Sequence, residues 1–370
     1  MKKILFGMLI LLIAIGVTAC ASADVPEATE AVDTAETGGE EDGGTLYFYT
    51  WSEYIDPDIF AQFEEETGIT VVEDIFGSNE DLLAKLQGGA TGYDVYVPSD
   101  YMVAIMIEEG LLAELDQSRL ETIGNLDPTF TDPPFDPGME HCLPYFWGTT
   151  GIGFNWEDWE EAPNSWAYLF DPELSKDFSG QISLLDDMRE VFGAALIYLG
   201  YSAGTTDEAE LAEARDLVLG IKEHIYSFES DTYEDLMLTG ETRLSQGWSG
   251  DIFVAQGEDE NIDYIIPKEG AVMWVDNLCI SVDAAADPER LDRVYKWLDY
   301  LNRPDIAAQN TNWVWYASPN AAAEDGIDPE ILSYPAIYPD EETFARLQYL
   351  GNVGDATEMY SRMWTEIKTE

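Results

Sequence analysis

The chain has 370 residues, enough for two domains with separate cores, and its 46% apolar and 25% charged residues are globular values. Acidic residues outnumber basic ones by 74 to 17, which gives a formal net charge of −57. This charge argues against nucleic acids and anionic membrane surfaces as partners, because both are bound through Lys and Arg. It suits a cationic ligand, although adaptation to salt explains the acidic excess equally well.

The first twenty residues have the pattern of an export signal. Two lysines precede an apolar run of 14 residues, Ile4 to Val17, which is too short to span a bilayer comfortably. Small residues at positions 18 and 19 then lead into Cys20, an arrangement that resembles the lipobox of bacterial lipoproteins. The resemblance implies cleavage before Cys20 and attachment of lipid to its thiol. The alternative is an ordinary secretory signal with an incidental cysteine.

Residues 21–44 contain eight acidic residues and no basic one. Such a segment has nothing to bury, so we expect a disordered acidic tether between Cys20 and a folded body. Two cysteines remain, Cys142 and Cys279. One disulfide between them is possible, but because Cys279 lies in an apolar run, we favour its interpretation as a small buried side chain.

From Thr45 onward, strands and helices alternate. Aromatic and β-branched residues predict strands over Leu46 to Thr50, Ile69 to Phe76 and Tyr93 to Val97. Caps and apolar stripes predict a helix that begins after Asp56 and ends at Gly68, and further helices over Ser78 to Gln87 and Tyr101 to Leu112. This order implies an α/β fold with a largely parallel sheet and helices on its faces.

The middle of the chain has a different pattern. Asp127 to Pro144 is dense in proline and aspartate and is expected to be a long loop. Tyr145 to Phe154 is expected to be a strand that crosses to a second lobe. Apolar stripes predict amphipathic helices over residues 191–199 and 291–301.

Residues that follow the strands are candidates for a site, because ligands of parallel α/β sheets bind beyond the carboxyl ends of the strands. Several clusters there join an aromatic residue to a carboxylate: Trp51-Ser52-Glu53-Tyr54, Ser99-Asp100-Tyr101, Trp248-Ser249-Gly250-Asp251 and Trp274-Val275-Asp276. Carboxylates neutralise ammonium groups and aromatic faces attract them, so the recurrence favours an organic cation. Taken singly, each cluster also fits packing or turn roles, and the spacing of Asp187 and Glu190 fits a helix cap.

Motifs for catalysis or cofactor binding are not evident. His141 and His224 are far apart in sequence, and Glu140-His141-Cys142 offers too few metal ligands. Gly247 to Asp251 departs from the G-x-S-x-G nucleophile elbow at its last position, and no dinucleotide fingerprint or P-loop occurs. We therefore expect no metal and no cofactor, while a glycosidase with paired carboxylates stays open.

Several motifs resemble those of the bacterial spermidine/putrescine-binding proteins, the extracellular solute-binding components of polyamine ABC transporters. They are residues 46–54 (LYFYTWSEY), 93–101 (YDVYVPSDY), 143–148 (LPYFWG), 187–192 (DMREVF), 267–270 (PKEG) and 274–276 (WVD). The resemblance implies a periplasmic-binding-protein-like fold of type II, in which two α/β lobes joined by hinge crossovers close over a ligand. On that basis lobe 1 takes residues 45–148 and 274–320, and lobe 2 takes residues 149–273 and 321–370.

The resemblance also implies a set of ligand-binding residues. The aromatic walls are expected to be Trp51, Trp248 and Trp274, and the contacts around them Ser52, Glu53, Tyr54, Ser99, Tyr101 and Tyr316. The carboxylates expected to receive amine groups are Asp187 and Glu190 from the second lobe, Asp276 at the centre, and Asp251. A glutamine contact of the family has no equivalent in register, because Gln348 lies too early.

The expected function is that of a solute-binding lipoprotein, exported and lipid-anchored at the outer face of the cell membrane or in the periplasm. It captures spermidine or putrescine, delivers them to an ABC permease, touches the membrane only through its lipid and performs no chemistry. Asp251 is typical of putrescine-preferring members, whereas Asp187 with Glu190 is the spermidine pattern, and Trp274 favours spermidine. The alternatives are a binder of another cation or a sugar, and a secreted carbohydrate-active hydrolase.

Overall fold

The computed structural model describes residues 43–369. The predicted signal sequence, Cys20 and most of the predicted tether lie outside the described residues. Gly43 and Gly44, which we had placed in the tether, belong to the folded body, because their backbones hydrogen-bond to Gly68 and Thr70. Within residues 43–369, no helix is both long and apolar enough to cross a membrane.

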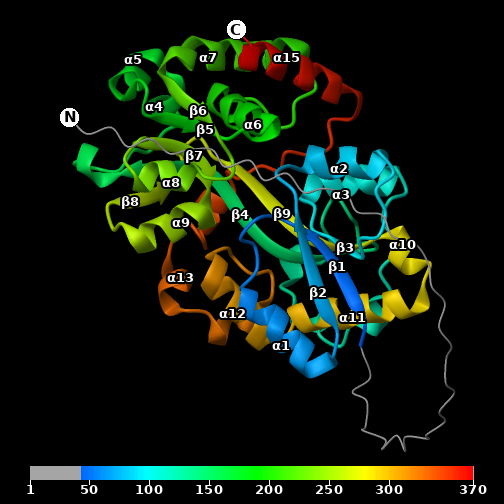
Figure 1. Ribbon diagram of the computed structural model, residues 1–370. Coiled ribbons are helices and arrows are strands. Elements are labelled where there is room, and N and C mark those ends of the chain that lie inside the picture. Colours follow the sequence, from blue (N-terminus) through cyan, green and yellow to red (C-terminus); the bar gives the residue numbers. More distant parts are fainter. Residues whose placement is uncertain (1–42, 370) are drawn as a thin grey trace, which may run out of the picture. The chain divides into compact units, whose positions relative to one another are not determined.

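The described chain alternates strands and helices along most of its length (Figure 1). The strands are β1 (Thr45–Thr50), β2 (Thr70–Ile75), β3 (Val95–Tyr96), β4 (Cys142–Asn155), β5 (Ile182–Leu184), β6 (Ile225–Phe228), β7 (Leu244–Trp248), β8 (Ile262–Ile265) and β9 (Val272–Ile280). The helices are α1 (Pro57–Thr67), α2 (Asn79–Gln87), α3 (Asp100–Glu108), α4 (Ala167–Phe170), α5 (Pro172–Ser175), α6 (Met188–Leu199), α7 (Glu208–Ile221), α8 (Tyr233–Leu238), α9 (Ser249–Glu258), α10 (Val282–Ala285), α11 (Pro288–Leu301), α12 (Pro304–Val314), α13 (Pro329–Ser333), α14 (Glu341–Phe344) and α15 (Thr357–Thr369).

Local sequence signals correctly predicted the first strand and both ends of the first helix. Asp56 caps α1 by accepting a hydrogen bond from the Asp58 backbone, and Gly68 ends the helix in the left-handed conformation at φ 72°. The third strand and helix are shorter than expected. β3 covers only Val95–Tyr96, and α3 ends at Glu108, two residues before the left-handed Gly110.

The sheet is mixed, so the expectation of a largely parallel sheet is wrong. Its strand order is β2-β1-β3-β9-β4-β7-β5-β6, with β8 also paired to β4. Pairs are parallel at the two ends (β1 with β2 and β3, β5 with β6 and β7) and antiparallel wherever β4 or β9 takes part. The two antiparallel strands come from distant parts of the chain, where local alternation gives no sign of their direction.

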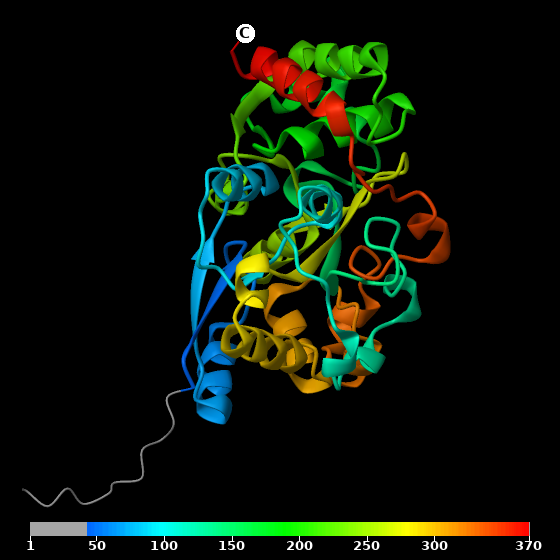
Figure 2. The ribbon, with the colours of Figure 1, turned by 90° about the vertical axis from the view of Figure 1, so that its right-hand side faces the viewer.

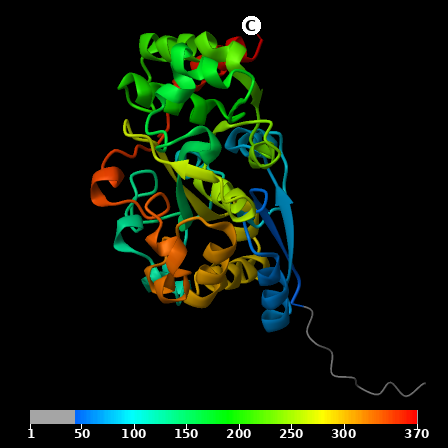
Figure 3. The same ribbon diagram turned by 90° about the vertical axis from the view of Figure 1, so that its left-hand side faces the viewer.

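Two groups of helices cover the two ends of this sheet. Figure 1 shows α1, α11 and α12 near β1 and β2, and α6, α7 and α15 together near β5 and β6. Figures 2 and 3 show the same grouping from two further sides. Phe48, Val294 and Leu298 are buried in the first group, and Phe192 and Met363 are buried in the second.

Strands β4 and β9 connect the two ends. The first part of β4 pairs with β9, from Cys142 opposite Cys279 to Thr150 opposite Val272. Beyond Thr150, β4 pairs with β7 and β8 instead. Gly148 lies opposite Trp274, and these are the positions at which the predicted lobe 1 ends and begins again. The lobe boundaries themselves stay a prediction.

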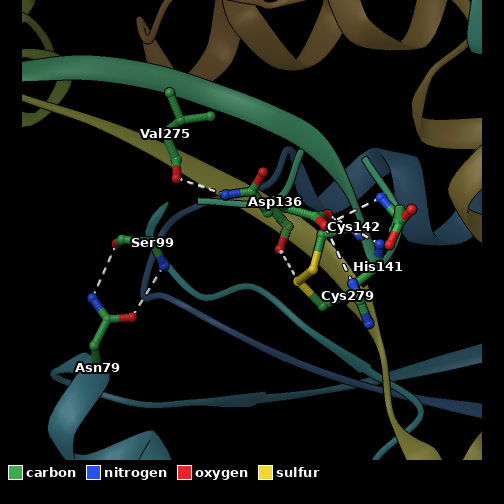
Figure 4. The surroundings of a disulfide bond; sticks show 9 residues. Asn79, Ser99, Asp136, His141, Cys142, Val275 and Cys279 are labelled. Atoms are coloured by element: carbon green, nitrogen blue, oxygen red, sulfur yellow. Dashed lines mark hydrogen bonds and ion pairs between the residues drawn. A yellow bond between two sulfur atoms is a disulfide. The ribbon is translucent and has the colours of Figure 1, made fainter. Parts of the chain in front are cut away.

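Cys142 and Cys279 form a disulfide between β4 and β9 (Figure 4), so the interpretation of Cys279 as a mere buried side chain is wrong. Both residues are buried. The apolar run around Cys279 correctly indicated burial but carried no information about its cross-strand partner. The predicted loop before Cys142 is also shorter than expected, because β4 begins at Cys142 and Asp136 accepts hydrogen bonds from the backbones of His141 and Cys142.

Candidate functional site

A cavity of about 520 Å³ lies where β1 and β7 end, against the middle of β9. Trp274 to Asp276 lie within β9, so the expectation that this cluster follows a strand is wrong. Every ligand-binding residue that we predicted lines it. These residues are Trp51, Ser52, Glu53, Tyr54, Ser99, Tyr101, Asp187, Glu190, Trp248, Asp251, Trp274, Asp276 and Tyr316. The structure therefore brings the predicted set together, while its contact with a ligand stays a prediction.

The lining is strongly acidic. Among the described residues that line the cavity, ten are acidic and none is Lys, Arg or His. The acidic residues are Glu53, Asp100, Asp187, Glu190, Asp231, Glu234, Asp235, Asp251, Glu258 and Asp276. Carboxylates gathered in a hollow of low dielectric concentrate negative potential there, so the cavity is suited to a cation carrying several charges.

Asp276 lies on β9 with both carboxylate oxygens held by hydroxyl groups. Ser99 donates to Oδ1 at 2.6 Å and Tyr54 donates to Oδ2 at 2.5 Å. Asn79 fixes Ser99 in turn, through its side-chain amide and carbonyl (Figure 4). Burial raises the pKa of the Asp276 carboxyl to about 7, while the two hydroxyl groups pull it down. Asp276 is thus a buried carboxyl of fixed orientation, and a nearby cation would favour its ionised form.

Asp251, in the first turn of α9, is held in the same way. Tyr316 donates to Oδ1 at 2.6 Å and Tyr233 donates to Oδ2 at 2.9 Å. Burial raises the pKa of Asp251 to about 6, and the hydroxyl groups of Tyr316 and Tyr233 oppose that rise.

The rings of Tyr54 and Tyr316, whose hydroxyl groups hold Asp276 and Asp251 respectively, pack against each other in the cavity wall. Their ring centroids lie 5.5 Å apart. Each follows a residue in the left-handed region, Glu53 at φ 52° and Trp315 at φ 60°. Such a conformation costs about 1–2 kcal/mol for a residue with a side chain and is often found at functional sites.

Asp187 and Glu190 form a third acidic group at the start of α6. Asp187 is the N-cap, and its Oδ1 accepts from the backbones of Arg189 and Glu190. Its capping role, which we had considered from the spacing, is confirmed. Burial, and then the charge of Asp187, raises the pKa of Glu190 to about 8. Glu190 Oε2 is buried with no hydrogen-bond partner among the described residues.

A buried guanidinium lies just behind this group. The Arg189 guanidinium carbon is 4.7 Å from the centroid of the Tyr101 ring and 5.1 Å from that of Tyr360. Its Nη2 donates to the carbonyl groups of Leu350 and Gly351. Arg189 does not line the cavity. It instead supports Tyr101, whose hydroxyl donates to Glu80.

Aromatic rings also line the cavity. The ring centroid of Trp51 lies 4.5 Å from that of Phe76 and 6.2 Å from that of Trp248. Its Nε1 donates to the Val97 carbonyl. Trp274 meets Tyr316 edge to face at 4.9 Å. The Trp274 Nε1 is buried with no partner in the described chain. These rings present apolar faces between the carboxylates.

Sequence reasoning missed several lining residues. Glu234 on α8 has a pKa raised to about 8, first by burial and then by the charge of Asp251. Trp313 on α12 and Val254 on α9 also line the cavity, and they are 38% and 42% exposed. These residues lie inside helices rather than after strands, so the strand-end rule could not find them. Asp100 was inside a quoted cluster, and it accepts from the Val275 backbone at 2.9 Å.

Gln348, which had no equivalent in register, does not line the cavity. Its side-chain oxygen accepts from the Ala203 backbone, and its own backbone bonds to Ala271 and Met273.

Comparisons with known proteins agree with this fold and site. Residues 58–339 match the family described as bacterial extracellular solute-binding protein. The chain is 38% identical over 330 residues to the spermidine/putrescine-binding periplasmic protein of Escherichia coli (strain K12), covering 89% of this chain and 92% of that protein.

Two solved structures are similar over most of the chain. One, described as a putative spermidine/putrescine ABC transporter from Listeria monocytogenes, has a TM-score of 0.82 at 37% identity and covers 88% of this chain and 99% of its own. The Tp0655 (TpPotD) lipoprotein of Treponema pallidum has a TM-score of 0.76 at 31% identity, covering 87% and 99%.

The fold and the cavity thus define a solute-binding protein of the two-lobe α/β type. The chain belongs to the bacterial extracellular solute-binding proteins, and the resemblance to the spermidine/putrescine-binding proteins that its motifs indicated is confirmed.

Proposed function

We propose that the chain binds a linear polyamine, spermidine or putrescine, and delivers it to the permease of an ABC transporter. The observation that carries this proposal is the cavity lining, in which ten acidic side chains and several aromatic rings occur without a basic one. Glu190 Oε2, buried and unpartnered, is an acceptor that an ammonium group would satisfy.

The geometry suits alternating charges and methylene groups. Carboxylates at Asp276, Asp251 and Glu190 can each pair with an ammonium group, and the pairs at Asp276 and Glu190 are stronger than in bulk water because these two side chains are buried. The rings of Trp51 and Trp274 can cover the methylene segments between those groups. Hydroxyl groups already fix Asp276 and Asp251, so little side-chain freedom is lost on binding.

The same proposal assigns the two walls of the site to two lobes. Lobe 1, residues 45–148 and 274–320, contributes Trp51, Ser99 and Asp276. Lobe 2, residues 149–273 and 321–370, contributes Asp187, Glu190 and Asp251. Closure of one lobe on the other would bring both sets of carboxylates onto one ligand.

Binding without chemical turnover is the activity that we propose, with ATP hydrolysis on a separate subunit. A sugar carries no positive charge and could neutralise none of the ten acidic side chains, whereas each ammonium group of a polyamine can pair with one of them. A carbohydrate-active hydrolase would need a proton donor next to the scissile bond. Glu190 and Glu234, whose pKa values burial raises to about 8, are carboxyls of that kind, so the turnover assay below tests this alternative directly.

Export and anchoring complete the proposal. Cleavage before Cys20 and lipidation of its thiol would hold the folded body at the outer face of the cell membrane or in the periplasm. The lipobox-like sequence supports this, as does the description of one structural relative as a lipoprotein.

Calorimetry with putrescine, spermidine and spermine on a form that begins at residue 21 tests the proposed ligand class. We expect saturable binding of at least one of the three, and none of glucose or maltose. Absence of binding to all three amines, or hydrolysis of a glycoside panel, would overturn the proposal.

A further inference from the structure

The turn between β7 and α9 carries a motif that the proposed function does not explain. Its sequence, Gly247-Trp248-Ser249-Gly250-Asp251, has glycines on either side of Trp248. Neither glycine has a positive φ angle, so the backbone conformation does not require glycine at either position. The reason for two glycines must be the space beside them.

Tyrosine rings fill that space. A Cβ atom on Gly250 would lie 2.6 Å from two ring carbons of Tyr316 and 2.7 Å from the Val314 carbonyl oxygen. A Cβ atom on Gly247 would lie 2.4 Å from a ring carbon of Tyr233. Contacts this short are not tolerated, so any side chain at either position would displace the ring or the turn.

The displaced rings are those that hold Asp251. Tyr316 donates to one oxygen of its carboxylate and Tyr233 to the other. The Trp248 backbone donates to the Tyr233 hydroxyl at 2.9 Å, which fixes that donor in turn. Both rings are almost fully buried. The tyrosines therefore have no alternative position from which to reach Asp251.

We propose that Gly247 and Gly250 are positioning residues, which admit Tyr233 and Tyr316 against the turn so that Asp251 is clamped as a fixed anchor for a terminal ammonium of a diamine. This inference rests on the proposed function for its ligand, but not for its geometry. A shorter ligand has fewer ammonium groups, so it depends more on each anchor. The glycines should therefore influence selectivity between diamine and triamine.

The first test needs no ligand. Carbon-13 NMR titration of the side-chain carboxyls gives the pKa of Asp251 in the wild type and in Tyr316→Phe, Tyr233→Phe and Gly250→Ala. Because hydroxyl donors favour the carboxylate, we expect each variant to raise the pKa of Asp251. The control is Gly257→Ala on the same helix, where an added Cβ meets nothing within 4 Å.

The second test is a double-mutant cycle measured with putrescine and spermidine. Loss of a hydrogen bond to a charged group corresponds to about tenfold in affinity, so we expect Gly250→Ala to weaken putrescine by about tenfold and spermidine by less. In an Asp251→Asn background, Gly250→Ala should weaken putrescine binding by less than about twofold, because the carboxylate that the tyrosines hold is no longer there.

Equal effects of Gly250→Ala in both backgrounds, or an unchanged pKa of Asp251, would overturn the proposal. If Gly250→Ala does not fold, Tyr316→Phe and Tyr233→Phe test the proposal instead, because each keeps its ring and removes only the hydroxyl group. A pKa that rises in these variants while no polyamine binds to the wild type would support the clamp and refute the proposed function. The two failures are therefore distinguishable.

Discussion

Asp276 is the residue on which the proposed site depends most. Its carboxylate is buried between the hydroxyl groups of Tyr54 and Ser99. We expect Asp276→Asn to weaken polyamine binding by about two orders of magnitude or more, because leaving a buried ammonium without its partner costs about 3–5 kcal/mol. Calorimetry measures the affinity. The melting temperature without ligand should change little, and near-normal binding would reduce Asp276 to a structural residue.

Substitution of Glu190 tests whether the site prefers a triamine or a diamine. If Glu190 with Asp187, Asp276 and Asp251 each receive one ammonium group, the three charges of spermidine satisfy all three sites, whereas the two charges of putrescine leave one site without a partner. We therefore predict that spermidine binds more tightly than putrescine, and that Glu190→Gln weakens spermidine more than putrescine. Competition titrations measure both affinities, with Glu65→Gln on the exposed side of α1 as a control.

Asp251 is the alternative carboxylate that could determine ligand preference. If it gives a diamine a second anchor, Asp251→Asn should weaken putrescine most. Tighter putrescine binding by the wild type, together with no effect of Glu190→Gln, would show that Asp251 sets the specificity.

At the scale of elements, sequence reasoning succeeded where the signal was local. Asp56, Pro57 and Gly68 marked the ends of α1 because caps act within a few residues. Pairing of β4 with β9 could not be read in the same way, since Cys142 and Cys279 are 137 positions apart. The strand-end rule found the cluster around Trp51, which directly follows β1, because sheet topology gathers such ends, whereas Trp274 to Asp276 lie inside β9. Glu234 and Trp313 reach the cavity only through the packing of α8 and α12.

The disulfide between β4 and β9 gives a prediction at this scale. Replacing Cys142 and Cys279 with alanine should lower the free energy of unfolding by about 2–5 kcal/mol, because the cross-link closes a long loop in the unfolded chain. Urea denaturation with and without reductant measures it. Neither cysteine lines the cavity, so polyamine affinity should be retained. A large loss of affinity would show that the cross-link also shapes the site.

At the scale of the whole molecule, binding should be coupled to protons. Burial raises the pKa of Asp276 to about 7, of Glu190 to about 8 and of Asp251 to about 6. An ammonium group favours the ionised carboxylate, so binding should release protons and affinity should rise between about pH 6 and 8. Calorimetry in buffers of different ionisation enthalpy counts the protons. Affinity that falls over this interval would contradict the prediction.

The same raised pKa values should make the ligand-free fold less stable as the pH rises, whereas ligand affinity increases. A carboxyl whose pKa is higher in the folded chain holds a proton that the unfolded chain has already lost. Its contribution to stability is therefore lost as the pH rises through the folded pKa. Saturation with polyamine should flatten that decline in a thermal melt.

Anchoring also belongs to the whole molecule. We predict that Cys20→Ala abolishes lipidation and releases the protein from membranes, because stable anchoring needs at least two acyl chains. Mass spectrometry of the wild-type N-terminus measures the modification directly. A cysteine without lipid, or a cleavage site elsewhere, would refute the anchoring proposal.

The cross-link at one end of the β4–β9 pair also restricts how such a molecule can open. Two strands joined at Cys142 and Cys279 cannot slide past each other without breaking the ladder that runs from there to Thr150 and Val272. Sliding is therefore excluded as the main motion. If the two lobes move as proposed, the two strands would have to bend and twist near Gly148 and Trp274. Because Trp274 is itself part of the cavity wall, such bending would change the shape of the cavity as well.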